Sequence, residues 1–196
     1  RITGATTSDY FGTFVGKGDF NADGKDDLVV SSVNNTTSFG RVYIFYNDGN
    51  YPSGATSADV IITDNVTNRF GSSLAVSDFN ADGRVDLVVG AITYSSNAGR
   101  AYIFYNDGSI PTTAATADVF IDGEASSSFG LNMMGGDLNA DGKADLIIAT
   151  SSYTTNTGRA YIFYNDGIIP TTAATADVII TGQAPSSYFG LDMTVG

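Results

Sequence analysis

A nine-residue acidic pattern, DxNxDGxxD, occurs three times in this chain of 196 residues. The copies begin at Asp19, Asp78 and Asp137, so each starts 59 residues after the one before it. A fixed period of this size is typical of a repeat architecture, in which every unit is one supersecondary structure stacked on its neighbours. The chain is therefore expected to fold as a short array of equivalent units.

Other landmarks repeat with the same period, so the whole unit is repeated and not only the acidic pattern. Phe-Gly pairs begin at Phe11, Phe70 and Phe129, and a fourth follows at Phe189. The spacing predicts three full units at 11–69, 70–128 and 129–188, with the end of a preceding unit at 1–10 and the start of a further unit at 189–196. Because neither end falls at a unit boundary, we expect a longer array or a closed ring.

Each unit contains four short apolar runs bounded by turn residues, and none reaches the ~10 to 12 residues typical of a helix. In the three units, the first strand is expected at 13–18, 72–77 and 131–136, and the second at 27–32, 86–91 and 145–150. The third strand is expected at 41–47, 100–106 and 159–165, and the fourth at 59–63, 118–122 and 177–181. The second and third strands carry apolar residues on both faces, which is typical of a sheet packed between two others. The prediction is an all-β fold of β-propeller blades, each with four antiparallel strands.

The acidic pattern has the chemistry of a cation site. Calcium takes six to eight oxygen ligands, and a tight loop supplies them from alternate positions. Side chains at positions one, three, five and nine and the carbonyl oxygen at position seven would form one site per repeat, three in all. The candidate ligands are Asp19, Asn21, Asp23, Lys25 and Asp27; Asp78, Asn80, Asp82, Arg84 and Asp86; and Asp137, Asn139, Asp141, Lys143 and Asp145.

Three alternatives to a calcium loop closed at position nine are an EF-hand, an ion-free turn and a magnesium site. An EF-hand needs an acid at position twelve, where this chain has Val30, Val89 and Ile148, so that interpretation fails. Three Asp/Asn-Gly turns without any ion would need only ordinary turn residues. Carboxylates at identical offsets in all three copies favour the cation, because a turn has no need for several negative charges facing one point. Magnesium is disfavoured, since it keeps its waters and rarely accepts an all-protein site.

Composition excludes several classes of function. The chain has 21 acidic and 9 basic residues, a net charge of −12, and ten of the acids lie in the three patterns. This balance argues against nucleic acid as a partner. The absence of Cys and His excludes disulfides, thiolate chemistry, imidazole bases and zinc or copper sites. The chain contains no run of about 18 apolar residues, so no membrane span is predicted. With no catalytic set apparent, we expect a protein that is not an enzyme.

Repeated Arg and Tyr residues open the third strand of each unit. We expect Arg41, Arg100 and Arg159 to pair with an acid or a carbonyl, the alternative being contact with a ligand. The tyrosines two residues later, Tyr43, Tyr102 and Tyr161, are expected to pack within the blade with the hydroxyl at its rim. Each Phe-Gly pair is expected to supply a core aromatic beside a close backbone approach.

Phe-Gly, then DxNxDGxxD, then a DLVVGA-like strand resembles the FG-GAP repeat, the unit of the integrin α-subunit propeller and of many secreted bacterial proteins. The best copy is FGSSLAVSDFNADGRVDLVVGA, residues 70–91, and the resemblance covers essentially the whole chain. The Gly-Ala-Pro element is only approximated, as Gly90-Ala91-Ile92 in that copy, which affects strand ends and not ligands. The resemblance implies a propeller, commonly of seven blades, with calcium between the first and second strands.

These observations favour a secreted, calcium-stabilised scaffold for adhesion or interaction, with a protein or glycan ligand. One alternative is a structural subunit that self-associates through its incomplete blades into a filament or array. Others are a carbohydrate-binding module and an accessory domain of a larger secreted enzyme. Fold alone does not decide among them.

Overall fold

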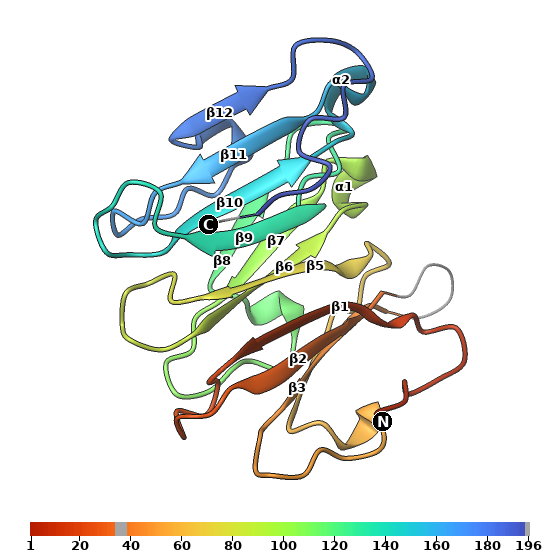
Figure 1. Ribbon diagram of the computed structural model, residues 1–196. Coiled ribbons are helices and arrows are strands. Elements are labelled where there is room, and N and C mark those ends of the chain that lie inside the picture. Colours follow the sequence, from red (N-terminus) through yellow and green to blue (C-terminus); the bar gives the residue numbers. More distant parts are fainter. Residues whose placement is uncertain (34–38, 195–196) are drawn as a thin grey trace.

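The computed structural model describes residues 1–33 and 39–194, so parts of the expected units at 11–69 and 189–196 lie outside the described residues. The chain forms three four-stranded antiparallel sheets, each made of four strands consecutive in sequence. Figure 1 shows the sheets following one another from the red N-terminal part to the blue C-terminal part, without closing into a ring. The all-β prediction with four antiparallel strands per blade is confirmed.

The first strands of the three sheets lie side by side: β1 (Phe11–Gly18) beside β5 (Phe70–Ser77), and β5 beside β9 (Asn132–Gly136). The second strands are β2 (Asp27–Ser32), β6 (Asp86–Ala91) and β10 (Asp145–Thr150). The third strands are β3 (Arg41–Phe45), β7 (Arg100–Phe104) and β11 (Arg159–Phe163). The fourth strands are β4 (Val60–Thr63), β8 (Val119–Asp122) and β12 (Val178–Thr181).

The middle strands are buried on both faces, as predicted from their lack of polar alternation. Every residue of β6 and β10 is buried, and the same is true of β7 after its first residue. A sheet with both faces covered needs apolar residues at consecutive positions, because alternate side chains point to opposite faces. The apolar runs Leu87-Val88-Val89 and Leu146-Ile147-Ile148 meet this need.

The strand ends differ from the prediction by one or two residues for identifiable reasons. Strands β1 and β5 begin two residues early and include the Phe-Gly pair, where Gly12 and Gly71 have φ near 90° and the register shifts. The third strands end two residues early because the next backbone N–H groups bond to side chains. The Tyr46 N–H donates to Asp59 Oδ2 and the Asn47 N–H to Asp27 Oδ1.

Short turns that the sequence did not predict connect the strands. Two four-residue turns, α1 (Tyr94–Asn97) and α2 (Tyr153–Asn156), follow the second strands of the second and third sheets, and each contains residues with positive φ, so neither is a regular right-handed helix. Three 3₁₀ turns, η1 (Ala55–Ser57), η2 (Ala114–Thr116) and η3 (Ala173–Thr175), precede the fourth strands. Among the described residues, no helix is both long enough and apolar enough to cross a lipid bilayer.

Tyrosines of the third strands connect neighbouring blades. The Tyr102 hydroxyl donates to Asp64 Oδ2 at 3.3 Å, and the Tyr161 hydroxyl donates to Glu124 Oε2 at 2.6 Å. Both acids lie in the segment that leads out of the preceding blade. The pKa of Tyr102 is raised by burial and by the Asp64 carboxylate, so the phenol stays protonated and can donate. The predicted packing role is confirmed, but the expectation of a hydroxyl at the rim is wrong for Tyr102 and Tyr161, whose hydroxyls bond to acids between blades.

The arginines of the third strands are structural in the two blades where their contacts are described. Arg100 Nη2 donates to Asp122 Oδ2 at 2.9 Å, and Arg159 Nη1 donates to Glu124 Oε2 at 2.6 Å. Each guanidinium also lies over a tyrosine ring, Tyr94 at 3.8 Å and Tyr153 at 3.6 Å from the centroid. The prediction that these arginines pair with an acid or a carbonyl is confirmed for these two residues, both of which pair with an acid.

The aromatic rings of the second and third Phe-Gly pairs pack into the blades that they open, as predicted. Phe129 is fully buried and contacts Tyr161 edge-to-face at 5.2 Å and Phe163 at 6.4 Å between ring centroids. Phe70 makes the matching contacts with Tyr102 and Phe104. Phe189, the fourth copy, is 39% exposed. Phe11 opens a complete blade but is only partly buried, so the ring is fully buried at Phe70 and Phe129 alone among the four copies.

We predict that Phe129→Ala lowers the free energy of unfolding by about 3–5 kcal/mol, because it removes a fully buried ring and leaves a cavity. Phe189→Ala is the matched control at the same repeat position and is expected to cost much less. Urea denaturation followed by circular dichroism measures both. Equal losses in the two variants would contradict the packing role.

Candidate metal centre

The three acidic loops join the first and second strands of the three sheets. They run from Asp19 to Asp27, from Asp78 to Asp86 and from Asp137 to Asp145. All three lie at the same end of their blades, on the left in Figure 1. The loop between the first and second strands therefore presents the same set of oxygen atoms once in each blade, along one side of the molecule.

Positions one, three and five of each loop are brought together by the turn itself. In the first loop, Asp19 accepts from the Asp23 N–H at 3.0 Å and from the Gly24 N–H at 2.8 Å. Asn21 Oδ1 accepts from the same Asp23 N–H, and Asp23 Oδ1 accepts from the Lys25 N–H at 2.9 Å. The position-six glycine has φ of +84°, a conformation that glycine adopts at low cost.

The second and third loops repeat this arrangement. Asp78 accepts from the N–H groups of Asp82 and Gly83 at 3.1 and 2.8 Å. Asp137 accepts from those of Asp141 and Gly142 at 3.1 and 2.9 Å. The remaining contacts also match the first loop. Asn80 and Asn139 at position three accept from the N–H of the position-five acid. That acid in turn accepts from the position-seven N–H of Arg84 or Lys143.

The position-nine acid is buried and ties the loop to the third strand. Asp27 Oδ2 accepts from the Phe20 N–H at 2.8 Å, and its Oδ1 accepts from the Asn47 N–H at 2.7 Å. The same pair of bonds forms at Asp86 with Phe79 and Asn106, and at Asp145 with Leu138 and Asn165. The sequence predicted only a ligand at this position, and this second role was missed. The Asn in each YND string, repeated every 59 residues, was the available signal.

The donor set fits a hard divalent cation in its chemistry. All side-chain donors are carboxylate or amide oxygens, the atoms that calcium prefers. Each carboxylate oxygen has two acceptor sites, so one bond to a backbone N–H leaves the other available. Among the described residues, no three acidic side chains converge as a cation cluster. Convergence of positions one to nine on a single point therefore remains a prediction.

The negative charge of the loops is only partly offset within the protein. In the first loop, Lys25 Nζ lies 3.5 Å from Asp23 Oδ2 and donates to the Asn47 carbonyl at 3.3 Å. The pKa of Asp86 is raised to about 6, chiefly by burial and also by the nearby carboxylates of Asp82 and Asp78, against two backbone hydrogen bonds that lower it. A cation close to these three acids would favour the ionised form of Asp86.

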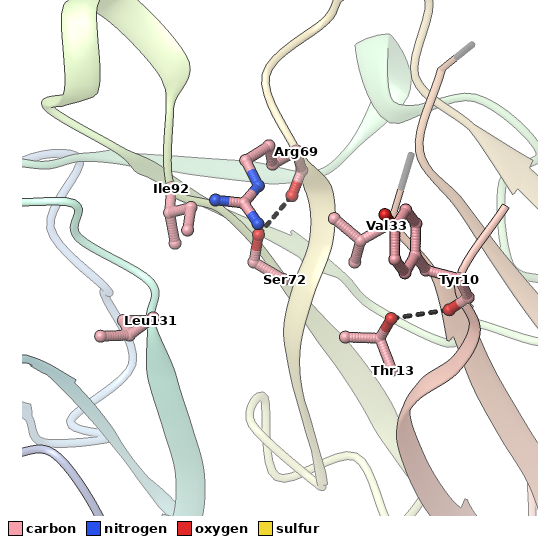
Figure 2. Close-up of a pocket in the computed structure, with 7 residues that line it drawn as sticks. All are labelled: Tyr10, Thr13, Val33, Arg69, Ser72, Ile92 and Leu131. Atoms are coloured by element: carbon pink, nitrogen blue, oxygen red, sulfur yellow. Dashed lines mark hydrogen bonds between the residues drawn. The ribbon is translucent and has the colours of Figure 1, made fainter. Parts of the chain in front are cut away.

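A separate cavity lies at the opposite ends of the first strands, where β1, β5 and β9 begin (Figure 2). Its volume is about 330 Å³, and its only charged lining residue among those described is Arg69. The residue before each Phe-Gly pair, Tyr10, Arg69, Ser128 or Tyr188, has φ between 51° and 61°. The repeat therefore holds this variable side chain in the same unusual backbone conformation. The cavity lining is Tyr10, Thr13, Val33, Arg69, Ser72, Ile92 and Leu131.

Sheets of four antiparallel strands with an acidic loop between the first two strands define a repeat protein built from propeller-type blades. The FG-GAP-like repeat matches residues 19–89 and 78–148, together well over half of the chain. The chain therefore belongs to the FG-GAP-like repeat family, as the motifs predicted.

Proteins of two kinds are similar to this chain. Phosphatidylinositol-glycan-specific phospholipase D of Dictyostelium discoideum is 31% identical, over 99% of this chain and 24% of that protein. Integrin alpha-IIb of Homo sapiens is 27% identical, over 100% of this chain and 21% of that protein. Integrin alpha-7 of Rattus norvegicus is 32% identical, over 56% of this chain and 10% of that protein. The chain thus spans about a quarter or less of the length of these relatives.

We predict that Asp27→Asn destabilises the fold by about 1–3 kcal/mol in a chelating buffer, because one of the two buried N–H groups loses its acceptor. Asp26→Asn is the control, since the neighbouring Asp26 is exposed and makes a surface ion pair with Lys17 that contributes little. Urea denaturation in EDTA measures both. An Asp27 variant as stable as the Asp26 variant would exclude the structural role of position nine.

Proposed function

We propose that this chain is a calcium-stabilised part of an FG-GAP propeller that serves as an extracellular scaffold for adhesion or interaction. Each acidic loop binds one Ca²⁺, three in all, through the position-one, -three, -five and -nine side chains and the position-seven carbonyl. The ion joins the hairpin between the first and second strands and supports the blade. The units at 11–69, 70–128 and 129–188 are each one blade, with parts of neighbouring blades at 1–10 and 189–196.

The observation that carries this proposal is the position of the loops in the blade. The buried acids Asp27, Asp86 and Asp145 each connect an exposed loop of oxygen donors to the third strand of the same sheet. A cation that binds the loop would therefore act directly on the hydrogen bonds that hold the sheet together. This arrangement supports a stabilising role and not a catalytic one.

The proposed location is extracellular, where free calcium would be high enough to fill loops of modest affinity. Extracellular calcium modules bind with dissociation constants of roughly 10⁻⁴ to 10⁻³ M, which suits places where free calcium is abundant. The partner is a protein or a glycan, and the net charge of −12 disfavours nucleic acid. The cavity around Arg69 lies at the end of the blades away from the calcium loops, which leaves that end available for a ligand.

The activity of any longer protein that contains this chain is a separate proposal. Some relatives are named as phospholipases D, and this chain matches about a quarter of the Dictyostelium protein. The chain has no His or Cys, and the candidate site contains only carboxylates, amides and carbonyls in structural contacts. We therefore propose that this chain is not itself an enzyme. An accessory role in a larger secreted enzyme, including binding of carbohydrate, is the alternative that the phospholipase matches favour.

Calcium removal should lower the melting temperature of the chain. At about 10 mM calcium, a site with the expected affinity adds roughly 1.4–2.7 kcal/mol of stability, because the ion binds only the folded state. Differential scanning calorimetry with EDTA, then with calcium restored, measures the effect, and magnesium serves as the comparison ion. A variant with Asn at Asp19, Asp78 and Asp137 should fold but lose the response. A melt that EDTA leaves unchanged would remove the calcium proposal.

A second candidate function is self-association through the two outer blades, and the exposed apolar faces favour it. Ile180 in β12 is 44% exposed, whereas Ile62 and Ile121 at the same repeat position are fully buried by the next blade. Val15 in β1 is 63% exposed, whereas its counterparts Leu74 and Met133 are buried. Each outer face therefore has the composition of an inter-blade contact. We propose that the outer face of one copy packs against the opposite outer face of a second copy, as neighbouring blades pack within the chain.

For self-association, light scattering coupled to size-exclusion chromatography should show a mass that rises with concentration. Ile180→Asp or Val15→Asp should then return the chain to a monomer, because each places a charge in the contact. Val66→Asp is the control, since Val66 is exposed in a loop away from both faces. A wild-type chain that stays monomeric at high concentration would exclude this candidate.

A further inference from the structure

Three asparagines occupy the same position after the third strand but make different side-chain contacts. In Asn47, Asn106 and Asn165, the backbone N–H donates to the position-nine acid of the same blade. The side-chain amide of Asn106 instead reaches the preceding blade, where Nδ2 donates to the Phe20 carbonyl at 2.9 Å across 86 residues of sequence. Asn106 is 2% exposed, so this bond is shielded from water.

This contact completes a line of hydrogen bonds between two acidic loops. Asp86, the position-nine acid of the second loop, accepts from the Asn106 N–H at 2.8 Å. Asn106 Nδ2 donates to the carbonyl of Phe20, whose own N–H donates at 2.8 Å to Asp27, the position-nine acid of the first loop. One asparagine thus touches the second loop through its backbone and the first loop through its side chain.

We propose that Asn106 is a positioning residue that couples the calcium affinities of the first and second loops. This inference rests on the proposed calcium function. A cation in the second loop would hold Asp86 in place, and with it Asn106 and the Phe20 peptide of the first loop. Part of the ordering needed by the first loop is then already achieved, which makes the coupling positive and, by linkage, reciprocal.

Among the described residues, the other two asparagines make no such bridge, so the proposed coupling is limited to one pair of loops. Asn47 Nδ2 donates to the Asp26 carbonyl within its own loop at 3.2 Å. Asn165 is 3% exposed, and its Nδ2 has no hydrogen-bond partner among the described residues. The second and third loops are therefore expected to bind calcium independently of each other.

Each loop carries its own reporter for a calcium titration by NMR. The amide N–H groups of Gly24, Gly83 and Gly142 donate to the position-one acids of the first, second and third loops. Their ¹H–¹⁵N peaks follow the three loops separately in the intact chain. Asp82→Asn removes a carboxylate from the second loop, which weakens that site while leaving the ligands of the other two unchanged.

In the Asp82→Asn variant, the calcium midpoint at Gly24 should rise several-fold, while the midpoint at Gly142 stays constant. Adding Asn106→Leu should abolish the rise at Gly24. Adding Asn165→Leu, the matched change at the other blade contact, should leave it intact. Asn106→Ser, whose side chain is too short to reach Phe20, serves as the second variant should the leucine variant fail to fold.

The outcomes separate the coupling from the calcium proposal. If none of the three glycine peaks moves with calcium, the proposed calcium function fails and the coupling fails with it. If all three move, but Asp82→Asn leaves the midpoint at Gly24 unchanged or lowers it, the coupling alone is overturned. A rise at Gly24 that persists in both Asn106 variants would also overturn the role of Asn106.

Discussion

The buried carboxylate at position nine of each acidic loop is the contact on which each blade depends. Asp27, Asp86 and Asp145 each accept two backbone N–H groups, one from the start of the loop and one from the end of the third strand. These N–H groups have no partner in the strand ladder, and a buried donor left unpaired is costly. The acid therefore helps to close one end of the sheet without an ion, and in the proposed function a cation bound to the same carboxylate would restrict it further.

Contacts between blades give these closed sheets a common core. Consecutive apolar residues in the middle strands cover both faces, and a tyrosine in each of the last two blades donates to an acid from the segment before it. The apolar face of one blade is thus buried by the neighbouring blade. Outer faces without a neighbour leave apolar side chains such as Val15 and Ile180 in solvent. Each blade alone would bury too little apolar area to be stable.

In the proposed function, ion binding and partner binding are divided between the two ends of the blades. The acidic loops gather at one end, where their contacts connect to the sheet hydrogen bonds. The cavity around Arg69 lies at the other end, among segments whose side chains differ from repeat to repeat. A binding surface at the variable end and ion sites at the constant end would allow specificity to change without loss of the fold.

The sequence alone determined the period, the four strands of each unit and the placement of the acidic loops. These follow from local chemistry: apolar runs between turn residues form strands, and oxygen donors at alternate positions collect in a tight loop. The tertiary structure decided which residues distant in the sequence contact one another, and the spacing of motifs does not contain this information. The second role of Asp27, the acids that pair with Tyr102 and Tyr161, and the different surroundings of Asn47, Asn106 and Asn165 all depend on strand packing. Residues with identical repeat positions differ here because each blade has different neighbours.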